Sequence, residues 1–241
     1  MASNNSVLKA FKVLEVISQY PDGINLSSIV KETGLPKSTV FDICNALYQV
    51  DAIYFKDKTA KTYVIGSKMY VMGQIYTKNS NFINASAPFL KEFADKYNLS
   101  TSAAKRLHNT SVNVFKYQSN ASKVITSDVG DQVKLDKSVS GKVFLAYLNK
   151  DRLNEAYKEL KITDESFEME IKTIREQGYA LNNDEASEYI YSIAVPVFNF
   201  ENKNIGVLSA TSIKNNLDVK VQIDELKNIA NKVSKILGYQ K

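Results

Sequence analysis

Two short helical patterns separated by a tight glycine turn constrain the fold of this chain more than any other feature. Ile29 and Val30 mark a very short helix that ends at Thr33-Gly34, and Pro36 opens the next helix. Glycine adopts left-handed backbone angles without a Cβ clash, so the chain can reverse between the two helices. This spacing is typical of a helix-turn-helix.

The residues on either side complete a small module. Residues 53–55 and 62–65 are β-prone runs around a charged turn, which predicts a basic hairpin, or wing. Two further helical patterns are present: one before the turn, at Val7, Ala10, Phe11, Leu14 and Ile17, and one after it, with Val40, Ile43, Cys44 and Leu47 on its inner face.

From Phe82 onward, strand and helix patterns alternate. Ser86 is expected to cap a helix that has Pro88 in its first turn. The strands cluster as hairpins, which predicts an α+β domain with a mostly antiparallel sheet. We expect three parts: a winged helix-turn-helix domain at 1–66, a linker helix at 67–80 and a second domain at 81–241. The expected strands are 102–107, 112–118, 123–127, 188–198 and 204–212, and the expected helices are 141–148, 151–157, 164–177 and 218–237.

Composition narrows the class of protein. With 44% hydrophobic and 24% charged residues, the chain can bury a real core. Its longest apolar runs, such as Ile193 to Phe198, are too short to cross a bilayer. Residues 1–12 do not resemble a signal peptide and Cys44 is the single cysteine, so we expect a cytoplasmic protein that does not enter membranes. The net charge of +5 is compatible with a polyanion partner but does not require one.

The second helix of a helix-turn-helix is narrow enough to enter the major groove of DNA. Here Asn45 can pair with adenine, Asp42 can accept from cytosine, and the Phe41 ring can contact thymine methyl groups. Helix N-terminal amides and hydroxyls suit phosphate oxygens. The predicted DNA-binding residues are Lys37, Ser38, Thr39, Phe41, Asp42 and Asn45 on this helix, with Lys56, Lys58 and Lys61 in the wing.

A plainer interpretation exists for each of these side chains. Ser38 or Thr39 can serve only as a helix cap, and Lys58 can be an ordinary solvated turn residue. The alternative for the whole chain is a ligand-sensing or protein-interaction module that does not bind DNA. Steep loss of affinity with added salt would favour DNA, because phosphate neutralisation releases counterions.

Several segments resemble one family along almost the whole chain. They look like signatures of the IclR family of bacterial transcription regulators: residues 6–73, with Gly34-Leu35-Pro36-Lys37-Ser38-Thr39-Val40 and Tyr63-Val64-Ile65-Gly66, and then residues 138–146, 175–180 with 184–185, and 194–198. The resemblance implies a winged helix-turn-helix joined by a helix to a GAF-like effector-binding domain. It also implies a homodimer or homotetramer on a palindromic double-stranded operator.

The second half offers an independent hint of a ligand pocket. Alternation places Ser209 and Thr211 on one strand face, and Ser192 shares a face with Ala194. Serine and threonine also fill strand positions with no ligand role. The family resemblance strengthens the pocket reading, since similar regulators bind a small organic acid. The positions implied for this effector are Val139, Ser140, Asn182, Ser192, Ser209 and Thr211.

Two positions depart from the family pattern. Asn182 stands where an Asp is usual, which removes a charge, and Glu188-Tyr189 replaces a Leu-Gly-like pair. Both changes affect the shape and charge of the expected pocket, so they bear on the effector's identity.

Catalytic and metal sites are not indicated. His108 is the single histidine and reads as part of a turn between strands, and Cys44 lies in the other domain, so no metal-ligand spacing exists. Gly-rich phosphate loops of the Walker or dinucleotide type are absent from the sequence. We therefore expect a regulator without cofactor, not an enzyme.

Overall fold

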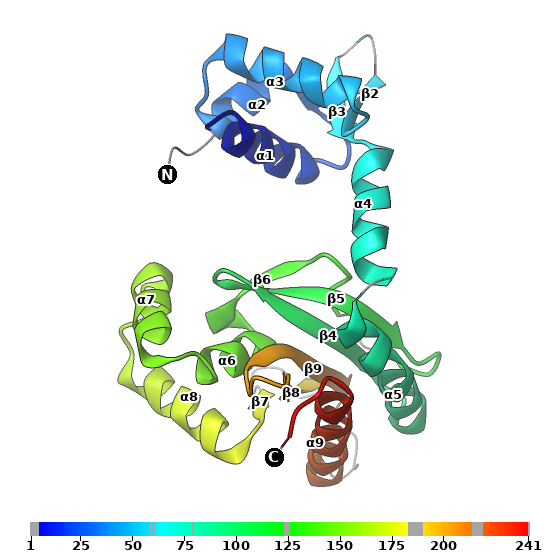
Figure 1. The fold of residues 1–241 in the computed structure, drawn as a ribbon, viewed down its shortest axis with the longest axis vertical. Coiled ribbons are helices and arrows are strands. Elements are labelled where there is room, and N and C mark those ends of the chain that lie inside the picture. The colour runs from blue at the N-terminus through cyan, green and yellow to red at the C-terminus, as the bar shows by residue number, and fades with distance from the viewer. Residues whose placement is uncertain are drawn as a thin grey trace. The chain divides into compact units, whose positions relative to one another are not determined.

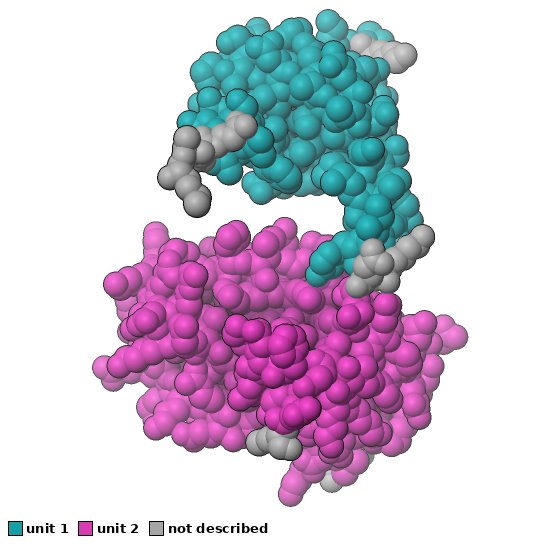
Figure 2. Space-filling view, viewed as in Figure 1, with its two compact units in different colours: residues 1–79 teal, residues 80–241 magenta. Residues whose placement is uncertain are grey.

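The computed structural model describes residues 5–57, 59, 61–78, 80–122, 126–182, 190–213 and 219–240. The chain divides into two compact units, residues 1–79 and 80–241 (Figure 2). The first unit combines helices with a small sheet, and the second combines a larger antiparallel sheet with helices. The predicted α+β fold class is confirmed.

The first unit begins with three helices, α1 (Asn5–Ser18), α2 (Leu26–Thr33) and α3 (Lys37–Gln49) (Figure 1). The Asn25 side chain accepts from the Ser28 N–H at 2.9 Å and starts α2. Gly34 ends α2 with φ of 66°, a left-handed conformation that suits glycine. The predicted helix-turn-helix is therefore present.

The wing follows α3 as β2 (Ile53–Asp57) and β3 (Thr62–Ile65), which pair antiparallel. A two-residue strand, β1 (Ile24–Asn25), pairs with the other edge of β3 and was not predicted. Phe55 joins the wing to α3, because its ring lies 5.3 Å from the Tyr48 ring and 4.7 Å from the Tyr63 ring, centroid to centroid. Helix α4 (Ser67–Lys78) comes next, as expected for the connecting segment.

The first unit buries only part of its helical apolar pattern. Leu14 and Ile17 of α1 are buried with Val13, whereas Val7 and Phe11 are about half exposed. On α3, Val40 and Cys44 are fully buried, which confirms its inner face. Spacing alone identified the helices, but it did not separate the side chains that face this core from those that face outward.

The second unit is built on a six-stranded sheet in the order β6-β5-β4-β9-β8-β7, and every pairing within it is antiparallel. The strands are β4 (Ser100–Leu107), β5 (Thr110–Gln118), β6 (Gln132–Lys134), β7 (Ala180–Asn182), β8 (Ile190–Phe198) and β9 (Asn204–Ile213). The short strands β6 and β7 were not predicted, since three residues give no usable periodicity.

Helices cover both faces of this sheet (Figure 1). One face packs on α5 (Asn81–Tyr97) and α9 (Val219–Ile236) through residues such as Ile193 and Leu208. The opposite face packs on α6 (Val139–Ala146) through Ala194 and Val207. Beyond α6 lie α7 (Lys150–Leu160) and α8 (Glu165–Gln177), and a 3-10 turn, η1 (Leu135–Lys137), precedes α6. None of the helices that the structure describes is both long and apolar enough to span a bilayer.

Two expectations for this unit are wrong. Helix α5 starts at Asn81 with Ser80 as its cap, so Pro88 lies in the helix interior and Ser86 does not cap it. The Ser86 hydroxyl instead donates to the Phe82 carbonyl at 2.7 Å, and the buried apolar face of α5 outweighs the cost of the proline. Residues 126–127 of the expected strand 123–127 are not in a strand, and residues 123–125 lie outside the described residues.

Gly141 provides a test of how closely α6 packs on η1. A Cβ atom at Gly141 would lie 2.3 Å from the Leu135 carbonyl oxygen, so Gly141→Ala forces the two backbones apart. We expect a loss of about 2 kcal/mol of unfolding free energy, measured by urea denaturation with circular dichroism. Gly73→Ala in α4 is the control: its Cβ meets nothing within 4 Å, and we expect a gain of up to about 1 kcal/mol. Equal stability of Gly141→Ala and the parent would contradict the close approach.

Candidate functional site

The outward face of α3 is available for contact. Lys37, Ser38, Phe41, Asp42 and Asn45 are exposed, and Thr39 is half-buried. Phe41 keeps 49% of its surface exposed although it is apolar, because the buried Val40 and Cys44 point the opposite way. The structure thus places the six predicted α3 residues away from the core of their own unit.

The wing carries less free positive charge than its sequence suggests. Lys56 donates to the Asp22 carboxylate at 2.9 Å and to the Pro21 carbonyl at 3.3 Å. Asp22 is fully exposed, so this pair is weakly held and a phosphate can replace it. Lys61 is exposed at φ of 51°, and Lys58 lies outside the described residues.

Across the second sheet, polar side chains form two neighbouring rows on the face that carries α6. In the first row Asn182 pairs with Ser192, Ser192 with Thr211, and Thr211 with Ser100. In the second row Ser209 lies between Ala194 and Ser102, and Ser102 pairs with Lys116. Side chains two residues apart on a strand share a face, so both rows lie on one side of β4, β8 and β9.

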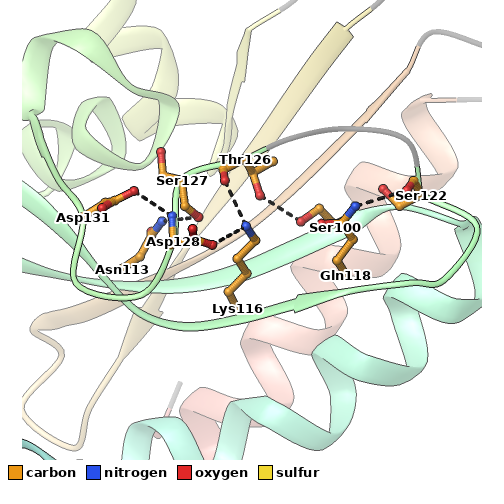
Figure 3. A network of polar contacts seen from close by, with 9 residues as sticks. All are labelled: Ser100, Asn113, Lys116, Gln118, Ser122, Thr126, Ser127, Asp128 and Asp131. Carbon is orange, nitrogen blue, oxygen red and sulfur yellow. Dashed lines mark hydrogen bonds and ion pairs between the residues drawn. The ribbon is translucent and has the colours of Figure 1, made fainter. Parts of the chain in front are cut away.

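Hydroxyl groups within and beside these rows bond to one another. The Ser102 and Ser209 hydroxyl oxygens lie 2.7 Å apart, and those of Ser192 and Thr211 lie 3.0 Å apart. A third pair joins Ser100 to Thr126 at 3.0 Å (Figure 3). Each pair consumes one O–H donor and leaves the second O–H and several lone pairs for another partner.

The N-terminus of α6 faces this polar surface. Ser138 caps α6 by accepting from the Gly141 N–H at 3.0 Å, and Val139 and Ser140 form the first turn. First-turn amides carry the positive end of the helix dipole, which favours an anion. Between this helix end and the sheet lies a cavity of about 320 Å³.

A segment after β5 forms another wall of the cavity, and Lys116 holds it. The Lys116 ammonium donates to the Thr126 carbonyl at 2.9 Å and pairs with the Asp128 carboxylate at 2.7 Å (Figure 3). Asp131 accepts from the Asp128 N–H at 2.7 Å in the same network. Lys116 thereby positions the Thr126 hydroxyl against Ser100, at the edge of the cavity.

All six positions predicted for the effector line this one cavity: Val139, Ser140, Asn182, Ser192, Ser209 and Thr211. Sequence reasoning missed Ser100 and Ser102 of β4. The sequence shows that these two serines alternate along one strand face, but it does not show that β4 pairs with β9. It also missed Ser111, Thr126 and Ser127. Glu188 and Tyr189, the second departure from the family pattern, lie outside the described residues.

Chemistry of other kinds has little support near the cavity. His108 lies in the β4–β5 turn with φ of 50°, as expected, and does not line the cavity. Within the described ranges, His, Cys, Asp and Glu side chains nowhere gather in a group of three or more suited to a metal ion.

Comparisons with known proteins now decide the family. Residues 6–55 match the IclR helix-turn-helix domain, and residues 74–235 match the bacterial transcriptional regulator IclR C-terminal domain. The chain belongs to the IclR family. It is therefore a transcriptional regulator with a helix-turn-helix DNA-binding domain and a C-terminal ligand-binding domain.

Relatives of this IclR-family regulator match it nearly end to end. An uncharacterized HTH-type transcriptional regulator of Haemophilus influenzae is 26% identical, covering 98% of this chain and 94% of its own. The HTH-type transcriptional regulator XynR of Escherichia coli is 24% identical, covering 97% of each chain.

Solved structures show the same fold. The crystal structure of an IclR transcriptional regulator from Alicyclobacillus acidocaldarius is 25% identical, with a TM-score of 0.83 over 98% of this chain and 100% of that one. An IclR homologue from Microbacterium hydrocarbonoxydans, solved with 4-hydroxybenzoate, is 18% identical, with a TM-score of 0.77 over 96% of this chain and 98% of that one.

Cys44 tests the packing behind α3. Burial raises the pKa of its thiol from 9.0 to about 11. At pH 8 the folded protein should hold about a hundredfold less thiolate than an unfolded chain, so modification by a disulfide reagent should be very slow until urea is added. Fast labelling of the native protein would show that the inner face of α3 opens readily.

Proposed function

We propose that this IclR-family regulator reads operator DNA with the outer face of α3, and that a small organic acid in the cavity changes its affinity for the operator. The observation that carries the proposal is the division of α3 into a buried inner face and an exposed polar and aromatic outer face. A helix with that division, held by a helix-turn-helix, presents its outer side chains to a major groove.

Roles on α3 follow from side-chain chemistry. Asn45 pairs bidentately with adenine, Asp42 accepts from the cytosine amino group, and Phe41 contacts thymine methyl groups. Lys37, with the hydroxyls of Ser38 and Thr39 near the start of the helix, contacts phosphates. These contacts fix both register and sequence preference.

The wing lysines supply attraction that does not depend on sequence. Lys61 and Lys56 contact phosphates, with Lys56 exchanging its exposed partner Asp22 for the DNA backbone. Lys58 lies outside the described residues, and its place in the sequence between Lys56 and Lys61 assigns it the same role.

In the second unit, the effector's carboxylate binds the N-terminus of α6 at Val139 and Ser140. Asn182, Ser192, Ser209 and Thr211 hold the rest of the molecule, and all six residues line the cavity. A ligand changes DNA affinity only if it binds one arrangement of the protein better than another, so we assign the effector that differential affinity.

Ligand binding is favoured over catalysis in this cavity. The chain's single histidine lies elsewhere, and the hydroxyls on the sheet bond to one another, not to a general base. We therefore propose a regulator without a catalytic step or a cofactor, acting in the cytoplasm, where bacterial operators are.

Exposed apolar side chains on α1 and α4 support assembly of the regulator into a homodimer, with a homotetramer as a further step. The large exposed residues are Val7, Leu8 and Phe11 on α1 and Tyr70, Val71, Met72, Ile75 and Tyr76 on α4. Apolar clusters of this extent on a helix surface mark interaction sites. Two copies present two α3 helices to a palindromic operator, so two weak contacts become one strong one.

The DNA-binding role is tested by the double variant Lys37→Ala, Asn45→Ala. Loss of one base contact and one phosphate contact should weaken operator binding at least tenfold in a gel-shift titration. Lys172→Ala, a lysine of α8 in the other unit, is the control and should bind normally. Affinity should also fall steeply with salt; a flat salt dependence would favour a protein-interaction module.

The self-association role is tested by Leu8→Glu, Phe11→Glu. Both side chains are more than half exposed, so the fold tolerates the charges, while an apolar interface does not. Light scattering after gel filtration should show at least a tenfold weaker dimer. Met169→Glu changes an even more exposed apolar residue, on α8, and should leave the dimer intact. Unchanged assembly of the α1 variant would exclude α1 from the interface.

A further inference from the structure

We propose that the ligand of the cavity is a polyhydroxylated acid, with one carboxylate and a chain of neighbouring hydroxyl groups. This inference rests on the proposed function, which places an organic acid in the cavity, and it adds the chemistry of the rest of the molecule.

The lining of the cavity is unusual in its side-chain types. Eleven of its 17 lining residues are Ser or Thr, and two more are Asn. The aliphatic side chains among them are Val133 and Val139, and no aromatic ring is among the lining residues within the described ranges. Pockets that hold hydrocarbon or aromatic ligands are lined mainly by apolar and aromatic side chains. This lining therefore selects against such ligands.

The serine and threonine hydroxyls of the cavity form regularly spaced pairs on the sheet. Ser192 with Thr211 and Ser102 with Ser209 form two bonded pairs in adjacent rows of the sheet. Adjacent rows lie about 7 Å apart along a strand, a distance that the extended chain of a five- or six-carbon compound spans. Each pair offers one O–H donor and free lone pairs, and an alcohol group is both donor and acceptor. Successive alcohols along one chain thus match successive pairs.

A ligand with an apolar body would bind less well, because it would leave these same hydroxyl groups without hydrogen-bond partners. A methylene chain or ring lying on the two rows would displace water and leave donors such as those of Ser209 and Thr211 without partners. Water excluded by a polyol is replaced by equivalent hydrogen bonds, so no such penalty arises.

Among the described residues that line the cavity, Asp131 and Lys137 are the charged ones, so most of a bound ligand meets neutral groups. Lys116 is held by Asp128 and the Thr126 carbonyl, Lys137 pairs with Asp136 at 3.1 Å, and Asp131 accepts from a backbone N–H. The α6 N-terminus can accept one anionic group. The rest of the ligand is therefore recognised through its hydroxyls.

Isothermal titration of the full chain with matched small molecules tests this inference. The polyhydroxylated acids are gluconate, galactonate and ribonate; hexanoate has the carboxylate without the hydroxyls, 4-hydroxybenzoate carries a ring, and sorbitol has the hydroxyls without the carboxylate. At least one of the three polyhydroxylated acids should bind at least about tenfold more tightly than hexanoate and 4-hydroxybenzoate.

Single-residue variants test whether the hydroxyl pairs on the sheet contribute to ligand affinity. Ser209→Ala and Thr211→Val each remove one hydroxyl from a pair. Each should lower the affinity for the polyhydroxylated acid about tenfold and leave the affinity for hexanoate unchanged. Ser212→Ala is the matched control: it lies on β9 but on the opposite face, next to Tyr191, and should leave the affinity unchanged. Melting curves of each variant show that the fold is retained.

The outcomes separate this inference from the function on which it rests. Equal or tighter binding of hexanoate or 4-hydroxybenzoate overturns the polyhydroxylated ligand but keeps an organic-acid effector. Sorbitol binding as tightly as the acids keeps the hydroxyl recognition and contradicts the carboxylate at α6. Failure of all three polyhydroxylated acids to bind overturns the inference, while operator binding, measured separately, still decides the DNA-binding role.

Discussion

The register of β9 between β4 and β8 is the constraint on which the second unit depends. It aligns Thr211 with Ser192 on one side and with Ser100 on the other, and it places Ser209 opposite Ser102. A shift of one residue would turn Ser209 and Thr211 toward α5 and α9, where Leu208 and Ala210 now pack. The apolar contacts of one face therefore hold the polar rows of the other in place, so the cavity depends on the packing of the core.

A similar division governs the first unit. Val40 and Cys44 fix the rotation of α3 against its core, and that rotation alone decides that Phe41, Asp42 and Asn45 face outward. Gly34 sets the direction from which α3 approaches, because its left-handed conformation ends α2 within one residue. The proposed DNA-reading face of α3 thus depends on the same few apolar contacts that stabilise the fold.

Much of this architecture could be predicted because the relevant signals are local. Gly34 and Pro36 delimit α2 and α3, and alternation in 204–212 found the polar face of β9. One local signal was misleading. Pro88 is typical of a first helical turn, but it lies in the interior of α5, because the buried side chains of Phe82, Leu90 and Phe93 stabilise the helix on both sides of the proline. The exposure of Val7 and Phe11 could not be predicted either, because the spacing of apolar residues indicates a helix but not which of them pack against the core.

The sequence by itself determined the helix-turn-helix, the wing and the family, because each depends on motifs a few residues long. The resemblance to that family then implied the six positions that line one cavity. Only the tertiary structure decided that Ser100 and Ser102 join Ser192, Ser209 and Thr211, and that Lys116 holds Thr126 beside them. Strand order and register arise from packing between segments a hundred residues apart. No local pattern in the chain specifies them.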